Sequence, residues 1–151
     1  MINNLRKMIE YSLTNSKKIA NCKNPKLYLM GFSAGASTIA AVSAEYSEVE
    51  KILLMAPSGD AGLDNCRKNL AKFSGEVYIA IGDKDDVVGT EAGKIFYDLV
   101  KAASKKELVI IPNCDHQFRG EINGKIMSVA PLWAFAQNKT FPSPDDGIVL
   151  Y

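Results

Sequence analysis

The segment Gly31-Phe32-Ser33-Ala34-Gly35 places a serine between two glycines, and an apolar run precedes it while a stretch of small residues follows it. Between a strand and a helix, this pattern is typical of a serine exposed in a tight turn and able to act as a nucleophile. At a helix start, unpaired backbone amides, first that of Ala34, would stabilise an oxyanion. The alternative is that Ser33 only caps a helix after a glycine turn.

An acidic loop and a single histidine could supply the other two groups that a serine nucleophile needs. The loop Gly82-Asp83-Lys84-Asp85-Asp86-Val87-Val88 directly follows an apolar run, and His116 follows the next one. Imidazole can accept a serine proton near neutral pH, and a buried carboxylate can hold the imidazole in one tautomer. A solvated acidic loop and a solvated histidine are the alternatives, and the spacing alone does not select one aspartate.

Three segments, Gly31–Gly35, Gly82–Val88 and Cys114–Phe118, resemble the nucleophile elbow, acid loop and histidine loop of the α/β-hydrolase family. The resemblance covers nearly the whole chain. In that family the acid loop tends to show a glycine, two variable residues, the catalytic aspartate and then small apolar residues, which matches Gly82, Asp85 and Val87. The resemblance therefore implies Ser33 as nucleophile, Asp85 as orienting acid and His116 as general base. It implies hydrolysis of a small carboxylic ester or thioester through an acyl-enzyme intermediate, without a cofactor.

The hydropathy pattern predicts the elements that would position these residues. Apolar runs predict four strands, at residues 26–30, 52–55, 77–81 and 108–111. Helical periodicity predicts five helices, at about residues 5–19, 34–44, 63–73, 90–103 and 125–138, with Pro131 as a kink in the last. Alternating helices and Val-, Ile- and Leu-rich strands favour an α/β fold with one parallel sheet.

The connections between the strands predict how the helices are distributed. Right-handed crossovers running in one direction place their helices on one face of the sheet, so the last helix should cover the other face. We expect that second face to be partly bare near residues 52–55.

The length predicts one domain, with a core at residues 1–139 and a tail at 140–151 that ends in the apolar segment Ile148-Val149-Leu150-Tyr151. Complete α/β-hydrolases have further strands before the nucleophile, and a loop after one of them supplies the second oxyanion donor. The resemblance is therefore to a truncated α/β-hydrolase fold, whose strand at 26–30 would form an apolar sheet edge. A homodimer through the exposed edge or face is our expectation, and the folding back of the tail is the alternative.

The same truncation leaves two other functions open. The chain could be a non-catalytic hydrolase remnant that dimerises or binds a partner, or it could be part of a longer enzyme.

Composition excludes several kinds of partner. The 18 basic and 17 acidic side chains are spread along the sequence and give a net charge of +1, so neither nucleic acid nor an acidic membrane is expected to bind. The first residues lack the apolar region of a signal peptide, which favours a cytoplasmic location. Cys22, Cys66 and Cys114 show no ligand spacing, so we expect reduced thiols and no metal site.

Overall fold

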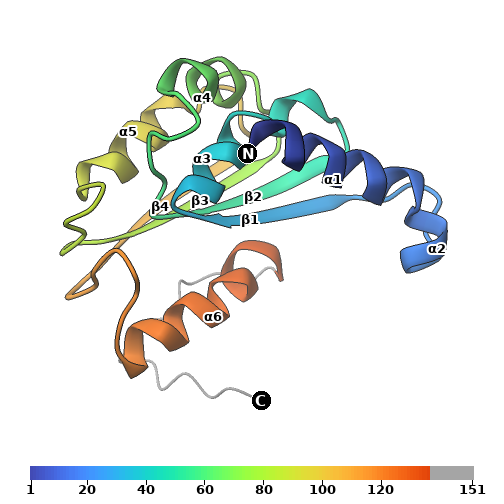
Figure 1. Ribbon diagram of the computed structural model, residues 1–151. Coiled ribbons are helices and arrows are strands. Elements are labelled where there is room, and N and C mark those ends of the chain that lie inside the picture. The colour runs from blue at the N-terminus through green and yellow to red at the C-terminus, as the bar shows by residue number, and fades with distance from the viewer. Residues whose placement is uncertain (137–151) are drawn as a thin grey trace.

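The computed structural model describes residues 1–136, and a parallel sheet of four strands lies at its centre (Figure 1). The strands are β1 (Leu27–Phe32), β2 (Val49–Met55), β3 (Glu76–Gly82) and β4 (Lys105–Ile111). They pair in chain order, each parallel to the next. The predicted α/β class, the strand number and the parallel pairing are therefore confirmed.

The helices also occur where the periodicity placed them, although several boundaries differ. They are α1 (Ile2–Thr14), α2 (Ser16–Ala20), α3 (Ala34–Ala40), α4 (Leu63–Leu70), α5 (Glu91–Leu99) and α6 (Glu121–Phe135), with a 3-10 turn, η1 (Ser43–Glu45). The predicted first helix is divided at Asn15, whose φ of −102° and ψ of 12° interrupt it. The last helix begins earlier than predicted, directly after Gly120, and Pro131 lies inside it.

The helices cover the two faces of the sheet unequally, as predicted. Figure 1 shows α1, α3, α4 and α5 on one face and α6 on the other. Successive side chains of a strand point to opposite faces of the sheet. Ile52 and Leu54 therefore pack in the core between the sheet and the crossover helices, whereas Leu53 and Met55 pack in the core between the sheet and α6. Because the strands are parallel, the turn at Ser33 and the loops after β3 and β4 all lie at the carboxyl end of the sheet.

The predicted bare patch near residues 52–55 is wrong. All four residues from Ile52 to Met55 are 0% exposed. The reason is that α6 lies across the centre of the sheet, where Ile126, Ala130 and Trp133 share a core with Leu53. A central strand is therefore covered on both faces.

Exposed apolar side chains of the sheet occur instead on β1, at its edge. Tyr28 is 44% and Met30 38% exposed, and within residues 1–136 this strand pairs only with β2. The ring of Phe135, the last residue of α6, lies 5.5 Å from the ring of Tyr28. The helix α6 therefore ends beside β1. The homodimer remains a prediction, and the tail at residues 140–151 lies outside the described residues. Within residues 1–136, no helix is both long and apolar enough to cross a bilayer.

Candidate active site

The structure brings the three predicted residues together at the carboxyl end of the sheet. Ser33 follows β1, Asp85 follows β3 and His116 follows β4. The imidazole Nε2 of His116 lies 3.0 Å from Ser33 Oγ, and its Nδ1 lies 2.8 Å from Asp85 Oδ2. Hydroxyl, imidazole and carboxylate thus form one continuous hydrogen-bonded chain, although 83 residues separate Ser33 from His116.

The backbone of Ser33 adopts a conformation that is unusual for a residue with a side chain. Its φ is +51° and its ψ is −119°, a strained region in which the surrounding structure must hold the residue. The Ser33 amide donates to the Met55 carbonyl on β2 over 2.9 Å, and its own carbonyl accepts from the Ser37 amide of α3 over 3.2 Å. Strand and helix together therefore fix the turn that exposes the hydroxyl.

The two glycines beside Ser33 have different roles. A Cβ on Gly31 would lie 2.6 Å from the carbonyl carbon of Gly35 and 2.7 Å from the Ala36 nitrogen, so this glycine lets α3 pack directly on β1. A Cβ on Gly35 would meet nothing within 4 Å. Close packing therefore requires a glycine at position 31 but not at position 35, because the crowding lies entirely on the strand side of the turn.

The Asp85 carboxylate is fully buried, and both of its oxygens have hydrogen-bond partners. Its side chain is 0% exposed, and its Oδ1 accepts hydrogen bonds from the amides of Val87 at 3.1 Å and Val88 at 3.0 Å. Its Oδ2 faces Nδ1 of His116. An Nδ1–H donated to this carboxylate leaves Nε2 as the acceptor for the serine hydroxyl. Asp83 and Asp86 in the same loop are exposed, so Asp85 is the loop carboxylate that reaches the histidine.

Backbone packing between the acid loop and the histidine loop sets the distance between their side chains. A Cβ on Gly82 would lie 2.0 Å from the Cys114 carbonyl oxygen, so the two loops touch at this point. The Lys84 amide donates to the same carbonyl over 3.0 Å, and the Asp83 amide donates to the Ile111 carbonyl over 3.0 Å. The sequence identified Gly82 only as part of a motif, because a contact between distant loops has no local signal.

Aromatic rings pack beside the imidazole. The ring of Phe32, the last residue of β1, lies 5.0 Å from the His116 ring and 6.2 Å from the ring of Phe118. Phe118 itself is buried and has a φ of +54°, which turns the chain back after the histidine. Phe32 therefore helps to orient the imidazole, a role that the sequence pattern did not reveal.

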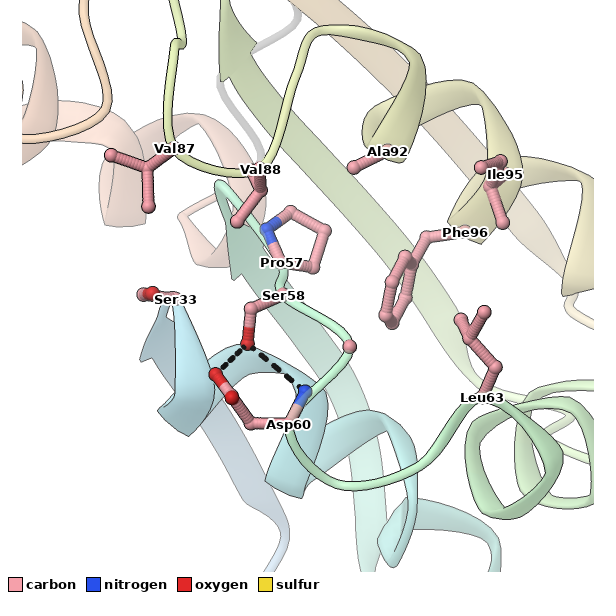
Figure 2. Close-up of a pocket in the computed structure, with 11 residues that line it drawn as sticks. Ser33, Pro57, Ser58, Asp60, Leu63, Val87, Val88, Ala92, Ile95 and Phe96 are labelled. Carbon is pink, nitrogen blue, oxygen red and sulfur yellow. Dashed lines mark hydrogen bonds between the residues drawn. The ribbon is translucent and has the colours of Figure 1, made fainter.

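A cleft of about 460 Å³ opens beside Ser33 (Figure 2). Its lining is Ser33, Pro57, Ser58, Gly59, Asp60, Leu63, Val87, Val88, Ala92, Ile95 and Phe96. The volume is within the usual range for small-molecule sites. Ser58 and Asp60 were not identified from the sequence, although their loop follows β2 and so lies at the edge where ligands bind in such sheets.

The cysteines do not form a metal site in the described part of the chain. No group of three or more potential ligands of the His, Cys, Asp and Glu types occurs in residues 1–136. All three thiols are free, and burial raises the pKa of Cys66 and of Cys114 to about 11. The two buried thiols are therefore protonated at neutral pH and are poor ligands and nucleophiles.

Comparison with known proteins gives matches at the level of structure. No family model and no curated protein matches the sequence. An esterase domain from Rhodothermus marinus superposes with a TM-score of 0.62 at 15% identity, over 77% of this chain and 59% of that one. An alpha-beta serine hydrolase homologue from Coxiella burnetii gives 0.60 at 22% identity, over 78% and 50%. A monoacylglycerol lipase from Paleococcus ferrophilus gives 0.68 at 12% identity, over 87% and 74%.

These matches define the fold as that of the α/β-hydrolases, as the sequence resemblance implied. The chain spans about three-fifths of the length of the Rhodothermus esterase domain and half that of the Coxiella protein.

Proposed function

We propose that this chain is a serine hydrolase that cleaves a small carboxylic ester or thioester through an acyl-enzyme intermediate. The observation that carries the proposal is the chain of contacts from Ser33 Oγ to His116 Nε2 at 3.0 Å and from His116 Nδ1 to Asp85 Oδ2 at 2.8 Å. These distances allow proton transfer from hydroxyl to imidazole without rearrangement. The structural neighbours, an esterase domain, a serine hydrolase homologue and a monoacylglycerol lipase, are consistent with this class of reaction.

In the acylation step, Ser33 Oγ attacks the carbonyl carbon while His116 Nε2 takes the hydroxyl proton. Asp85 holds the imidazole and stabilises its positive charge. The tetrahedral intermediate collapses, its bond to the leaving group breaks, and His116 returns the proton to the departing alcohol or thiol. In deacylation, water attacks the acyl carbon, His116 accepts a water proton, and the free acid leaves as the proton returns to Ser33.

The oxyanion of the tetrahedral intermediate needs a hydrogen-bond donor, and we assign this role to the Ala34 amide. Ala34 is the first residue of α3, and the first amides of a helix have no acceptor within it. In enzymes whose oxyanion hole has two donors, loss of one of them lowers turnover by about 10²- to 10³-fold. With the Ala34 amide alone, we expect turnover of activated esters to be slow but measurable.

The decisive experiment combines a fluorophosphonate probe with p-nitrophenyl acetate hydrolysis. The intact chain should be labelled and should release p-nitrophenol, and Ser33→Ala should abolish both. Ser43→Ala is a matched control, since Ser43 is a buried serine that follows α3 and lies outside the cleft. It should keep labelling and turnover.

The outcome separates the enzyme from the alternative of a hydrolase remnant that serves as a dimerisation or binding module. A chain that unfolds cooperatively but neither reacts with the probe nor hydrolyses the ester would contradict the proposal and favour the binding module. Turnover that survives in Ser33→Ala would show that another group performs the reaction.

A further inference from the structure

We propose that Asp60 is a specificity-determining residue of the cleft beside Ser33. The part of the substrate that occupies this cleft is called the cleft-filling group, and the negative charge of Asp60 excludes substrates in which this group is also negatively charged. The inference rests on the proposed function and specifies the substrate class of the same site. It predicts an ester with a largely apolar group that is neutral or cationic and that presents a hydrogen-bond donor to Asp60.

The two sides of the cleft differ in polarity. Figure 2 shows Ser33, Ser58 and Asp60 gathered on one side, with Leu63, Ile95 and Phe96 across from them. The apolar side chains come from α4, from α5 and from the two valines of the acid loop. Their combined surface favours burial of an alkyl or aryl group.

Asp60 is the one charged side chain among the residues that line this cleft. A substrate carboxylate placed here would approach a like charge and would find no basic lining residue to compensate. A hydroxyl or an ammonium group would instead find an acceptor. The charge arrangement thus discriminates between substrates of similar size, which an apolar wall alone does poorly.

The position of the Asp60 carboxylate is fixed by its own loop. Ser58 is 5% exposed, and its hydroxyl donates to Asp60 Oδ2 over 2.5 Å, while the Asp60 amide lies 3.4 Å from the same hydroxyl. The Ser58 amide in turn lies 3.4 Å from the Ser33 carbonyl, which ties this loop to the serine turn. Within residues 1–136 the other oxygen, Oδ1, accepts no hydrogen bond, so it is available to a donor on the substrate.

The test measures kcat/KM for three esters of nearly equal chain length that differ in charge. These are the p-nitrophenyl esters of hexanoate, 6-aminohexanoate and adipate (as the monoester). A second series has acetate esters of hexanol, 6-aminohexanol and 6-hydroxyhexanoate. Whichever series shows the charge preference identifies the cleft-filling group as the acyl group or the alcohol.

We expect the intact chain to prefer the neutral and cationic esters over the anionic one. Asp60→Asn keeps an oxygen that can accept from Ser58, and it should lower the ratio of cationic to anionic kcat/KM at least about fivefold. About fivefold is the size expected for one pair of unit charges about 4 Å apart in a solvent-like dielectric. The ratio combines attraction to the cationic ester and repulsion of the anionic one, so about fivefold is its lower bound. In the intact chain, high salt should weaken the preference, because Asp60 is exposed.

Asp64→Asn is the matched control. This substitution removes the same charge from an exposed position on α4 that does not line the cleft. It should leave the ratio unchanged. An unchanged ratio in Asp60→Asn, or an equal change in Asp64→Asn, would overturn the inference while p-nitrophenyl acetate turnover still supports the proposed function. Absence of any Ser33-dependent turnover would overturn both.

Discussion

Alanine substitution at Gly31 and at Gly35 should change stability in opposite directions, although these glycines lie only four residues apart. At Gly31 the new Cβ would lie 2.6–2.7 Å from three backbone atoms of Gly35 and Ala36, so no rotamer change can relieve the contact. Overpacking of this kind costs about 1–3 kcal/mol. At Gly35 the Cβ would enter open space on a helix, where alanine is more favourable than glycine by up to about 1 kcal/mol.

Urea unfolding of the two variants beside the intact chain measures this difference directly. The free energies of unfolding of the variants should differ by about 1–4 kcal/mol, which separates their midpoints by about 0.5–2 M urea at an m value of about 2 kcal/mol per M. The m value should stay constant, because neither change alters the surface that unfolding exposes.

Fluorophosphonate labelling gives an independent measure of the same packing. Gly31→Ala must displace α3 from β1, and so move Ser33 away from His116, whereas Gly35→Ala leaves the turn in place. We therefore expect slow labelling of the first variant and near-normal labelling of the second. Equal stability of the two variants, or a larger loss in Gly35→Ala, would refute the packing that we assign to the serine turn.

Other predictions concern the buried acid, the cleft, the thiols and the sheet edge. Asp85→Asn should lower kcat about 10⁴-fold because it removes the carboxylate that fixes the tautomer, whereas Asp86→Asn, at an exposed neighbour, should change kcat little; ester kinetics test both. Ile95→Ala should reduce the preference for p-nitrophenyl hexanoate over acetate by about fourfold per methylene no longer buried, and Ile110→Ala, outside the cleft, should not. A disulfide reagent at pH 8 should modify the two buried cysteines only after unfolding, because burial raises their pKa to about 11. Sedimentation should find a dimer, and a stable monomer would refute pairing through the edge of β1.

The sequence was sufficient for the two central strands because each of them lies between helices and must be apolar on both faces. The runs at residues 52–55 and 77–81 fall within β2 and β3, both of which are buried almost throughout. Helix ends were less predictable. The helix predicted to continue to residue 103 stops at Leu99, because Val100 turns to an extended conformation and buries its side chain.

The three residues of the candidate site were predictable because the chemistry of such a site restricts both their types and their places. A serine, an acid and a histidine at the ends of three parallel strands must face the same rim, so the order along the chain carries three-dimensional information. The contacts that tune their distances are different. The approach of Gly82 to Cys114 and that of Phe32 to His116 join residues more than 30 positions apart, and no local pattern encodes them.

The residues that line the cleft could not be predicted from the sequence. The loop after β2 could be placed at the functional rim from topology alone, yet Ser58 and Asp60 are residue types found in any surface loop. Asp60 and Asp86 are both exposed aspartates in loops after parallel strands, and only Asp60 lines the cleft. Specificity therefore depends on which way a loop turns after its strand, and the backbone geometry determines that direction.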